Sequence, residues 1–214
     1  RARRLLMTNN HVIPLAEAAR TASVEFGYER DLRAGAVAQL VLKLQPDDFF
    51  LTSPNITFDG LDFTLVALSR PAPEEIGFLE PLQGVTAARS TNIYVVQHPN
   101  GNPKAYVLSN NKKVSLPERY VTYLSDTQGG SSGSPLFDDS LRLVGIHHVG
   151  NFKALVGAKE EQTNLGSRIE EVVKEIVAQL RARAQSGSEP WDDERVRMWF
   201  GEGPVLSAWQ QAAP

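Results

Sequence analysis

The chain has 214 residues, of which 42% are hydrophobic and 22% charged, and its formal net charge is −3. This composition is typical of a globular protein with a full core, its net charge excludes nucleic-acid binding through a general basic field, and no apolar run approaches the length of a membrane-spanning helix. The absence of cysteine excludes disulfide scaffolds, thiol nucleophiles and cysteine-ligated metals.

Two sets of short strands are expected, one after the other. The first set falls at residues 4–8, 22–26, 35–42, 48–51 and 61–68. A proline-containing stretch without a clear period follows at residues 70–75 and is typical of a linker. The second set falls at residues 92–97, 104–108, 113–116, 120–124, 135–137 and 141–147. Many short strands with polar turns favour β-barrels or sandwiches, and this length predicts two halves joined near residues 70–90.

One helix follows the second set of strands. Ser167 and Glu170 have the spacing of a capping box, which predicts the start of the helix. Apolar residues then recur at helical spacing, at Ile169, Val172, Val173, Ile176, Val177 and Leu180. The helix should lie on the surface of a barrel and end near Gln185.

The tail, residues 186–214, has a different composition. It contains all three tryptophans, Trp191, Trp199 and Trp209. Residues 192–200 are expected to form a short helix with Val196, Trp199 and Phe200 on one face. We favour the interpretation that these aromatic side chains pack on the same chain. The alternative is a docking segment for a partner domain or a partner chain.

The loop at residues 128–135 has the composition that acyl transfer requires. Its sequence is Gln-Gly-Gly-Ser-Ser-Gly-Ser-Pro. The simplest interpretation is a polar turn between two strands. However, glycines at positive φ let backbone N–H groups converge on one point, and two such donors stabilise an oxyanion. A serine hydroxyl in this loop also needs a base, because the free hydroxyl is a weak nucleophile.

The chain has four histidines that are candidates for this base: His11, His98, His147 and His148. His11 follows an apolar strand and sits at its turn. A catalytic histidine needs a carboxylate that fixes its tautomer. Asp62 is the candidate, because it precedes an apolar strand, although an aspartate there is often only a turn residue. His98 precedes a proline in a turn-rich stretch and is interpreted as structural.

Three motifs, in this order, resemble the signatures of chymotrypsin-fold, trypsin-like serine peptidases. They are Thr-Asn-Asn-His-Val at 8–12, Asp-Phe-Thr-Leu-Val at 62–66 and Gly-Ser-Ser-Gly-Ser-Pro at 130–135. The order His, Asp, Ser matches this fold and not subtilisins or α/β-hydrolases. Residues 95–99, 126–127 and 146–148 further resemble bacterial enzymes near the glutamyl endopeptidases. The resemblance covers about residues 4–180.

The resemblance implies an all-β fold of two six-stranded antiparallel β-barrels followed by a C-terminal α-helix. Only five strands are expected before Arg70, so we expect that the first barrel lacks its first strand or that another segment takes the place of this strand. The implied division is an N-terminal barrel, a linker, a second barrel, the helix and the tail, at residues 1–75, 76–90, 91–166, 167–185 and 186–214.

The resemblance also assigns the roles of the site residues. His11 is then the general base, Asp62 the acid that orients it and Ser132 the nucleophile, with the N–H groups of Gly130 and Ser132 as the oxyanion hole. Ser131 is uncharged where zymogen-activated enzymes hold an aspartate, so activity is not expected to depend on a freed N-terminal amine. We therefore expect a serine endopeptidase that acts on protein or peptide substrates through an acyl-enzyme. No His, Asp and Glu cluster has the spacing of metal ligands, so neither a metal nor a cofactor is expected.

The residue preference stays open. The strand around residues 144–150 is expected to form one wall of the specificity pocket and, near His148, to pair with an extended substrate. Thr127 and His147 match the pair that reads glutamate in glutamyl endopeptidases. Asp126, in contrast, stands where trypsins hold the acid that binds Arg or Lys. Acidic, basic and small or apolar preferences are all compatible with these residues, and His147 could equally be a core histidine.

Two other interpretations of the whole chain remain. One is a non-catalytic binding module on the same fold, which would hold a partner peptide in its cleft. The other is a peptidase domain of a larger regulated protein. The chain begins at Arg1 rather than Met and shows no signal peptide, so we interpret it as a trimmed or processed piece. The lack of both cysteine and a visible leader favours a cytoplasmic over a secreted location.

Overall fold

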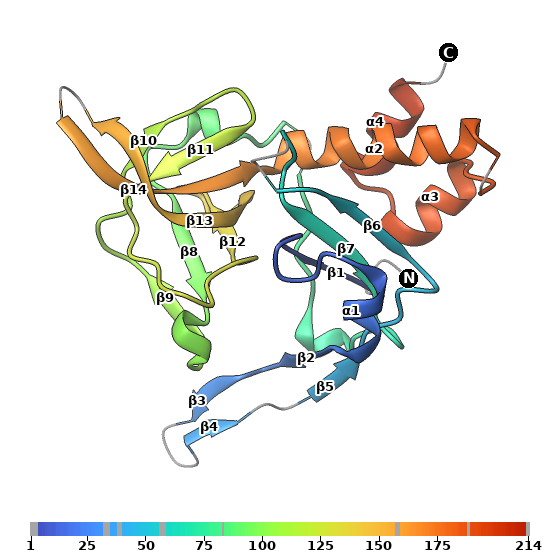
Figure 1. The fold of residues 1–214 in the computed structure, drawn as a ribbon, viewed down its shortest axis with the longest axis horizontal. Helices are drawn as coiled ribbons and strands as arrows, with labels where there is room; N and C mark the ends of the chain where they lie inside the picture. The colour runs from blue at the N-terminus through green and yellow to red at the C-terminus, as the bar shows by residue number, and fades with distance from the viewer. Residues whose placement is uncertain are drawn as a thin grey trace.

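The fold is described from a computed structural model of the chain. The structure describes residues 4–31, 35–37, 40–55, 59–82, 84–156, 159–187 and 189–212. Strands form two groups that lie side by side, and helices cover one of them (Figure 1). Of the helices in these ranges, none combines the length and the apolar character needed to cross a bilayer.

The first group consists of a small sheet and a long two-stranded arm. The sheet is antiparallel in the order β1-β7-β6, with the bounds β1 (Leu5–Thr8), β6 (Phe50–Ser53) and β7 (Phe63–Ala67). The arm pairs β2 (Ser23–Phe26) with β5 (Leu40–Lys43) and β3 (Glu29–Asp31) with β4 (Gly35–Val37). A short helix, α1 (Ala16–Thr21), connects β1 to the arm. The arm reaches the second group, where the ring of Tyr28 stacks on that of His98.

The second group is one antiparallel sheet in the order β10-β11-β14-β13-β12-β8-β9. Its bounds are β8 (Tyr94–Gln97), β9 (Ala105–Val107), β10 (Lys113–Ser115), β11 (Tyr120–Tyr123), β12 (Pro135–Phe137), β13 (Leu143–Val156) and β14 (Lys159–Arg168). Its core is made of inward-facing apolar residues such as Val95, Val121, Leu136 and Val144. Short 3₁₀ turns lie in the connections before β8 and after it, at Glu74–Ile76, Ala87–Arg89 and Pro99–Gly101.

Three helices follow β14 and cover the small sheet of the first group (Figure 1). They are α2 (Ile169–Gln185), α3 (Asp193–Phe200) and α4 (Pro204–Gln211). The predicted apolar stripe of α2 is confirmed, because all six of its residues are buried, and so is its end at Gln185. This stripe packs against Leu51, Phe63 and Leu65 of β6 and β7 in one core.

The predicted capping box of α2 is wrong. The residue that caps the helix is Arg168, and no side chain accepts a capping hydrogen bond there. Ser167 still belongs to β14, and its hydroxyl donates to the carbonyl oxygen of Leu61 at 2.6 Å. Glu170 accepts hydrogen bonds from Thr86 and Arg168. Tertiary partners therefore take both side chains that the local motif would use.

The tryptophans of the tail pack on this chain. Trp191, Trp199 and Trp209 are each at most 8% exposed and belong to the core that contains α2 and Phe49. The predicted short helix is confirmed as α3, which begins after Asp192, whose side chain accepts from the N–H of Arg195. Helix α4 was not predicted.

The predicted all-β, chymotrypsin-like fold with a C-terminal helix is confirmed, but neither group of strands closes into a barrel within the described residues. Strand β1 lies at the edge of its sheet and pairs there with β7. Strand β14 was missing from the predicted set. The predicted strand 35–42 is split between β4 and β5, and its positions 38–39 lie outside the described residues.

Candidate active site

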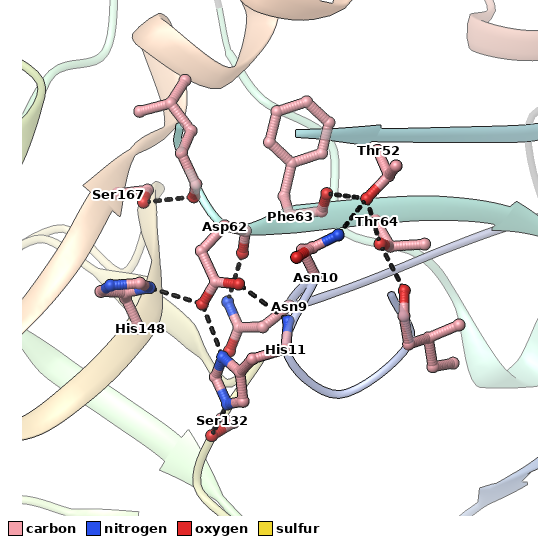
Figure 2. A network of polar contacts seen from close by, with 12 residues as sticks. Asn9, Asn10, His11, Thr52, Asp62, Phe63, Thr64, Ser132, His148 and Ser167 are labelled. Carbon is pink, nitrogen blue, oxygen red and sulfur yellow. Dashed lines mark hydrogen bonds and ion pairs between the residues drawn. The ribbon is translucent and has the colours of Figure 1, made fainter. Parts of the chain in front are cut away.

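Three side chains form a hydrogen-bonded row between the two groups of strands (Figure 2). His11 lies in the turn after β1, Asp62 directly precedes β7, and Ser132 lies in the loop before β12. Nδ1 of His11 is 2.6 Å from Oδ2 of Asp62, and its Nε2 is 2.8 Å from Oγ of Ser132. The structure thus brings together the three residues that the sequence motifs predict as base, orienting acid and nucleophile.

The backbone holds Asp62 in an unusual conformation. Its φ of 48° lies in the left-handed region, which costs a residue other than glycine about 1–3 kcal/mol. Its N–H donates to the carbonyl oxygen of Pro54 at 2.8 Å, and its carbonyl oxygen accepts from the amide of Asn9 at 2.8 Å. Oδ1 accepts from the backbone N–H of His11 at 2.9 Å. These bonds offset the strain and leave Oδ2 for the imidazole.

A second imidazole also contacts Asp62. Nδ1 of His148 lies 2.5 Å from Oδ2, so the carboxylate sits between the rings of His11 and His148 (Figure 2). Burial opposes the ionisation of Asp62 most strongly, but the hydrogen bonds from His148 and His11 together hold the pKa of its carboxyl below the usual value. The sequence interpretation gave His148 a role in the substrate wall and missed this contact. No local motif links two residues that are 86 positions apart.

The loop that carries Ser132 needs glycine at two positions. Gly130 has a φ of 86° and Gly133 a φ of 82°, both in the left-handed region. A Cβ on Gly133 would lie 2.9 Å from the hydroxyl oxygen of Thr8, so any other residue would push the loop away from the His11 strand. Within the described residues no acceptor is assigned to the N–H groups of Gly130 and Ser132. These two N–H groups are the predicted oxyanion donors.

A buried pair of neutral side chains holds the same loop. The hydroxyl of Ser131 donates to Oε1 of Gln97 at 2.6 Å and accepts from the backbone N–H of Gln128 at 3.2 Å. Nε2 of Gln97 donates to the carbonyl oxygen of Asp126 at 3.1 Å. Ser131 is thus anchored without an ionic partner, which supports the expectation that no freed amine is required. The sequence interpretation included Gln97 in the motif at residues 95–99 but gave it no role.

A cavity of about 460 Å³ opens beside Ser132. Its polar wall includes His11, Thr127, Gln128, Ser132, His147 and His148. No carboxylate is found among the described residues that line it. Asp126 is exposed and lies outside this lining. The pocket therefore offers no counter-ion for the side chain of Arg or Lys.

The two other predicted substrate residues do line this cavity. The hydroxyl of Thr127 donates to Oδ1 of Asn164 at 2.6 Å. His147 is buried, with Nδ1 2.6 Å from the hydroxyl oxygen of Tyr123. Burial, followed by the nearby His148 and His11, lowers the pKa of His147 from 6.5 to about 4. His98, in contrast, contacts Asn102 and Tyr28 and belongs to neither the row nor the cavity lining.

Among the described residues, His11, Asp62 and His148 are the group whose potential metal-ligand atoms all lie within 4.8 Å of one another. Ligands about 2.1 Å from a tetrahedral zinc ion lie about 3.4 Å apart. The nitrogen-to-oxygen distances here, 2.6 and 2.5 Å, are shorter than that. They are the distances of hydrogen bonds to a carboxylate, and we assign them as such.

Residues 1–146 match the family described as the trypsin-like peptidase domain. The chain belongs to this family. The chain is 40% identical over 162 residues to the uncharacterized protein y4fB of Sinorhizobium fredii (strain NBRC 101917 / NGR234), a match that covers 69% of the chain and 24% of that protein. It is 28% identical over 158 residues to the secreted RxLR effector protein 73 of Plasmopara viticola, which covers 68% of the chain and 38% of that protein. The chain thus spans well under half the length of both relatives.

The chain also resembles a solved structure titled "Structure of Glu endopeptidase in complex with MPD". The TM-score is 0.54 and the sequence identity 19%, and the match covers 80% of each chain. At this identity the likeness shows the fold, which is that of the chymotrypsin-like peptidases.

Proposed function

We propose that this trypsin-like peptidase is a serine endopeptidase that cleaves peptide bonds through an acyl-enzyme on Ser132. One observation carries the proposal: a single imidazole, that of His11, is within hydrogen-bond distance of both a buried carboxylate and a serine hydroxyl. This is the arrangement that turns a weak hydroxyl nucleophile into a reactive one.

The first half of the proposed reaction forms the acyl-enzyme. Oγ of Ser132 attacks the carbonyl carbon of the scissile bond, and Nε2 of His11 takes the hydroxyl proton. Asp62 accepts the Nδ1–H of His11, so that Nε2 is free to act as the base, and its charge stabilises the imidazolium that forms. The N–H groups of Gly130 and Ser132 stabilise the oxyanion.

The second half releases both products. The imidazolium of His11 gives its proton to the leaving amine when the tetrahedral intermediate collapses. A water molecule then replaces the amine, loses a proton to Nε2 and attacks the ester carbonyl on Ser132. Collapse of the second intermediate returns the proton to Oγ and frees the new carboxyl terminus.

A fluorophosphonate probe tests this proposal, because it reacts covalently only with an activated serine. We expect labelling of the folded wild-type chain that disappears in Ser132→Ala and persists in Ser140→Ala, which removes an exposed hydroxyl in a turn. Ser132→Ala should also lower peptide hydrolysis by a factor on the order of 10⁴–10⁶. A folded wild-type protein that neither reacts with the probe nor cleaves peptides would instead support a binding module on this fold.

A further inference from the structure

The tautomer of His147 is fixed from inside the protein. Among the described residues, the hydroxyl of Tyr123 has one hydrogen-bond partner, Nδ1 of His147. Tyr123 is fully buried, so its O–H group must find its acceptor there, and Nδ1 is the atom it reaches. Because Nδ1 accepts this hydrogen bond, the single ring hydrogen of the neutral imidazole resides on Nε2. Because Nδ1 is turned toward Tyr123, the Nε2–H edge is the one left for the cavity that His147 lines.

His147 stays neutral as well as oriented. Its side chain is 3% exposed, and burial holds its pKa near 4, so it carries no charge at neutral pH. The imidazoles of His148 and His11 further oppose a positive charge at this position. His147 thus offers the cavity an uncharged hydrogen-bond donor.

Thr127 offers the same cavity a hydrogen-bond acceptor. Its only hydroxyl proton is donated to Oδ1 of Asn164, whose orientation is fixed because its Nδ2 donates to the carbonyl oxygen of Ser125. Oγ1 of Thr127 can therefore only accept further hydrogen bonds. A Cβ on Gly150 would lie 3.2 Å from Oδ1 of Asn164 and 3.3 Å from Oγ1 of Thr127, so this glycine keeps the acceptor uncovered.

We propose that this pocket selects glutamine as the residue whose carbonyl is cleaved, an inference that rests on the endopeptidase function proposed above. A carboxamide presents one acceptor and one donor group. Its oxygen would accept from Nε2–H of His147, and its nitrogen would donate to Oγ1 of Thr127. Glutamine has the side-chain length that brings such a group into a pocket next to the scissile bond.

Other side chains leave one or both of these groups without a partner. A glutamate carboxylate has only acceptor atoms, so one of its oxygens would face Oγ1 of Thr127, which can itself only accept. His147, being neutral, would not offset the charge of this carboxylate. Methionine has nearly the shape of glutamine but satisfies neither group. Lys and Arg find no carboxylate among the described lining residues. An unmatched buried polar group costs a factor of about 10–100 in affinity or rate.

Four otherwise identical peptides, with Gln, Glu, Met or Lys at this position, test the inference. We expect the glutamine peptide to have a kcat/KM at least about 10-fold above the other three. In Thr127→Val the advantage of Gln over Met should fall by about 10-fold, and Thr127→Ser should restore it. In Tyr123→Phe the advantage of Gln over Glu should fall. Thr91→Val and Tyr106→Phe remove an exposed threonine hydroxyl and an exposed phenol, and should leave the ratios unchanged.

Binding to the Ser132→Ala protein separates the pocket from the chemistry. Calorimetry with the same four peptides should give the order found in kcat/KM, with Gln first. Glu, Met or Lys peptides that bind as well as the Gln peptide, or no binding by any of the four, would overturn the glutamine inference. If the wild-type chain shows no probe labelling and no hydrolysis, the endopeptidase proposal fails, whereas the binding order in Ser132→Ala still decides what the pocket selects.

Discussion

The His11–Asp62–Ser132 row and the pocket beside it each fix the tautomer of one histidine through its Nδ1 atom, and the two tautomers are opposite. In the row, a buried carboxylate accepts the Nδ1–H of His11. In the pocket, the buried phenol of Tyr123 contacts Nδ1 of His147. The carboxylate only accepts, so Nδ1 of His11 carries the ring hydrogen and Nε2 is left as an acceptor, whereas the phenol donates to Nδ1 of His147 and leaves Nε2–H as a donor. The partner at Nδ1 therefore determines whether the Nε2 atom of a histidine accepts or donates a hydrogen bond.

The two regions meet in β13, where His147 and His148 are adjacent. Successive side chains of a strand point to opposite faces. His147 accordingly reaches Tyr123, and His148 reaches Asp62. Strand β13 thus supplies His147 to the pocket and His148 to the contact with Asp62.

The largest expected effect comes from removing the negative charge of Asp62. Asp62→Asn keeps the size of the side chain but favours the wrong tautomer of His11, and we expect kcat to fall by about 10⁴-fold. Steady-state hydrolysis of a peptide substrate measures this loss. Asp126→Asn, at an exposed position outside the pocket, is the matched control and should keep the wild-type rate. Equal rates for wild type and Asp62→Asn would show that this carboxylate does not assist His11.

The next effect concerns His147 in the pocket and the pH dependence of the free energy of unfolding. Because the folded pKa of His147 is near 4 and its usual value is 6.5, the unfolded chain binds a proton at this residue between these values and the folded chain does not. The free energy of unfolding should therefore decrease as the pH falls through this window, by about 2 kcal/mol between about pH 7.5 and pH 5. Urea unfolding measures it, and His147→Gln should lack this part of the pH dependence. An identical pH dependence in both proteins would refute a neutral buried His147.

His148 tests the row from its other side, because its Nδ1 contacts the same carboxylate of Asp62 that contacts His11. We expect His148→Leu to lower kcat by about 30-fold with little change in KM, since Asp62 then loses one of its donors. His148→Asn places an amide N–H where Nδ1–H was and should recover most of the rate. A merely structural role predicts instead that Asn and Leu are equally poor, or that KM changes rather than kcat.

The smallest effect on kcat is expected for Gln97, which holds Ser131 in the loop that carries Ser132. Gln97→Leu removes the acceptor of the Ser131 hydroxyl and loosens the loop that positions Gly130. We expect kcat to fall by about 10-fold, because a small displacement of the donors weakens their contact with the oxyanion. Gln210→Leu, at an exposed position of α4, serves as the control. An unchanged kcat in Gln97→Leu would show that the loop keeps its shape without this bond.

The sequence predicted the three residues of the row because each one stands in a local motif at the end of a strand. The contacts of His148 with Asp62 and of Gln97 with Ser131 escaped prediction, because these hydrogen bonds join positions 86 and 34 residues apart. Similarly, nothing near Asp126 in the sequence tells whether its side chain enters the pocket. The structure shows that it is exposed and outside the lining.

The lack of a local sequence signal also explains the errors in the predicted fold. The first part of β14, residues 159–162, is polar and exposed and lacks the alternation that marks a strand. Its second part buries polar residues whose partners lie elsewhere, such as Ser167 with Leu61. That bond also removes Ser167 from the predicted capping box. Helix α2 itself was predicted well, because its apolar stripe repeats within the segment and depends little on distant partners.

Pre-steady-state hydrolysis of a p-nitrophenyl ester of an acylated glutamine tests the central claim most directly. The account predicts a burst of one nitrophenolate per wild-type chain, with the acyl group found on Ser132 by mass spectrometry of the acid-quenched protein. Asp62→Asn should slow the burst, and Ser132→Ala should abolish it. An acyl group attached to another residue, or turnover without any acylated protein, would contradict the proposed mechanism.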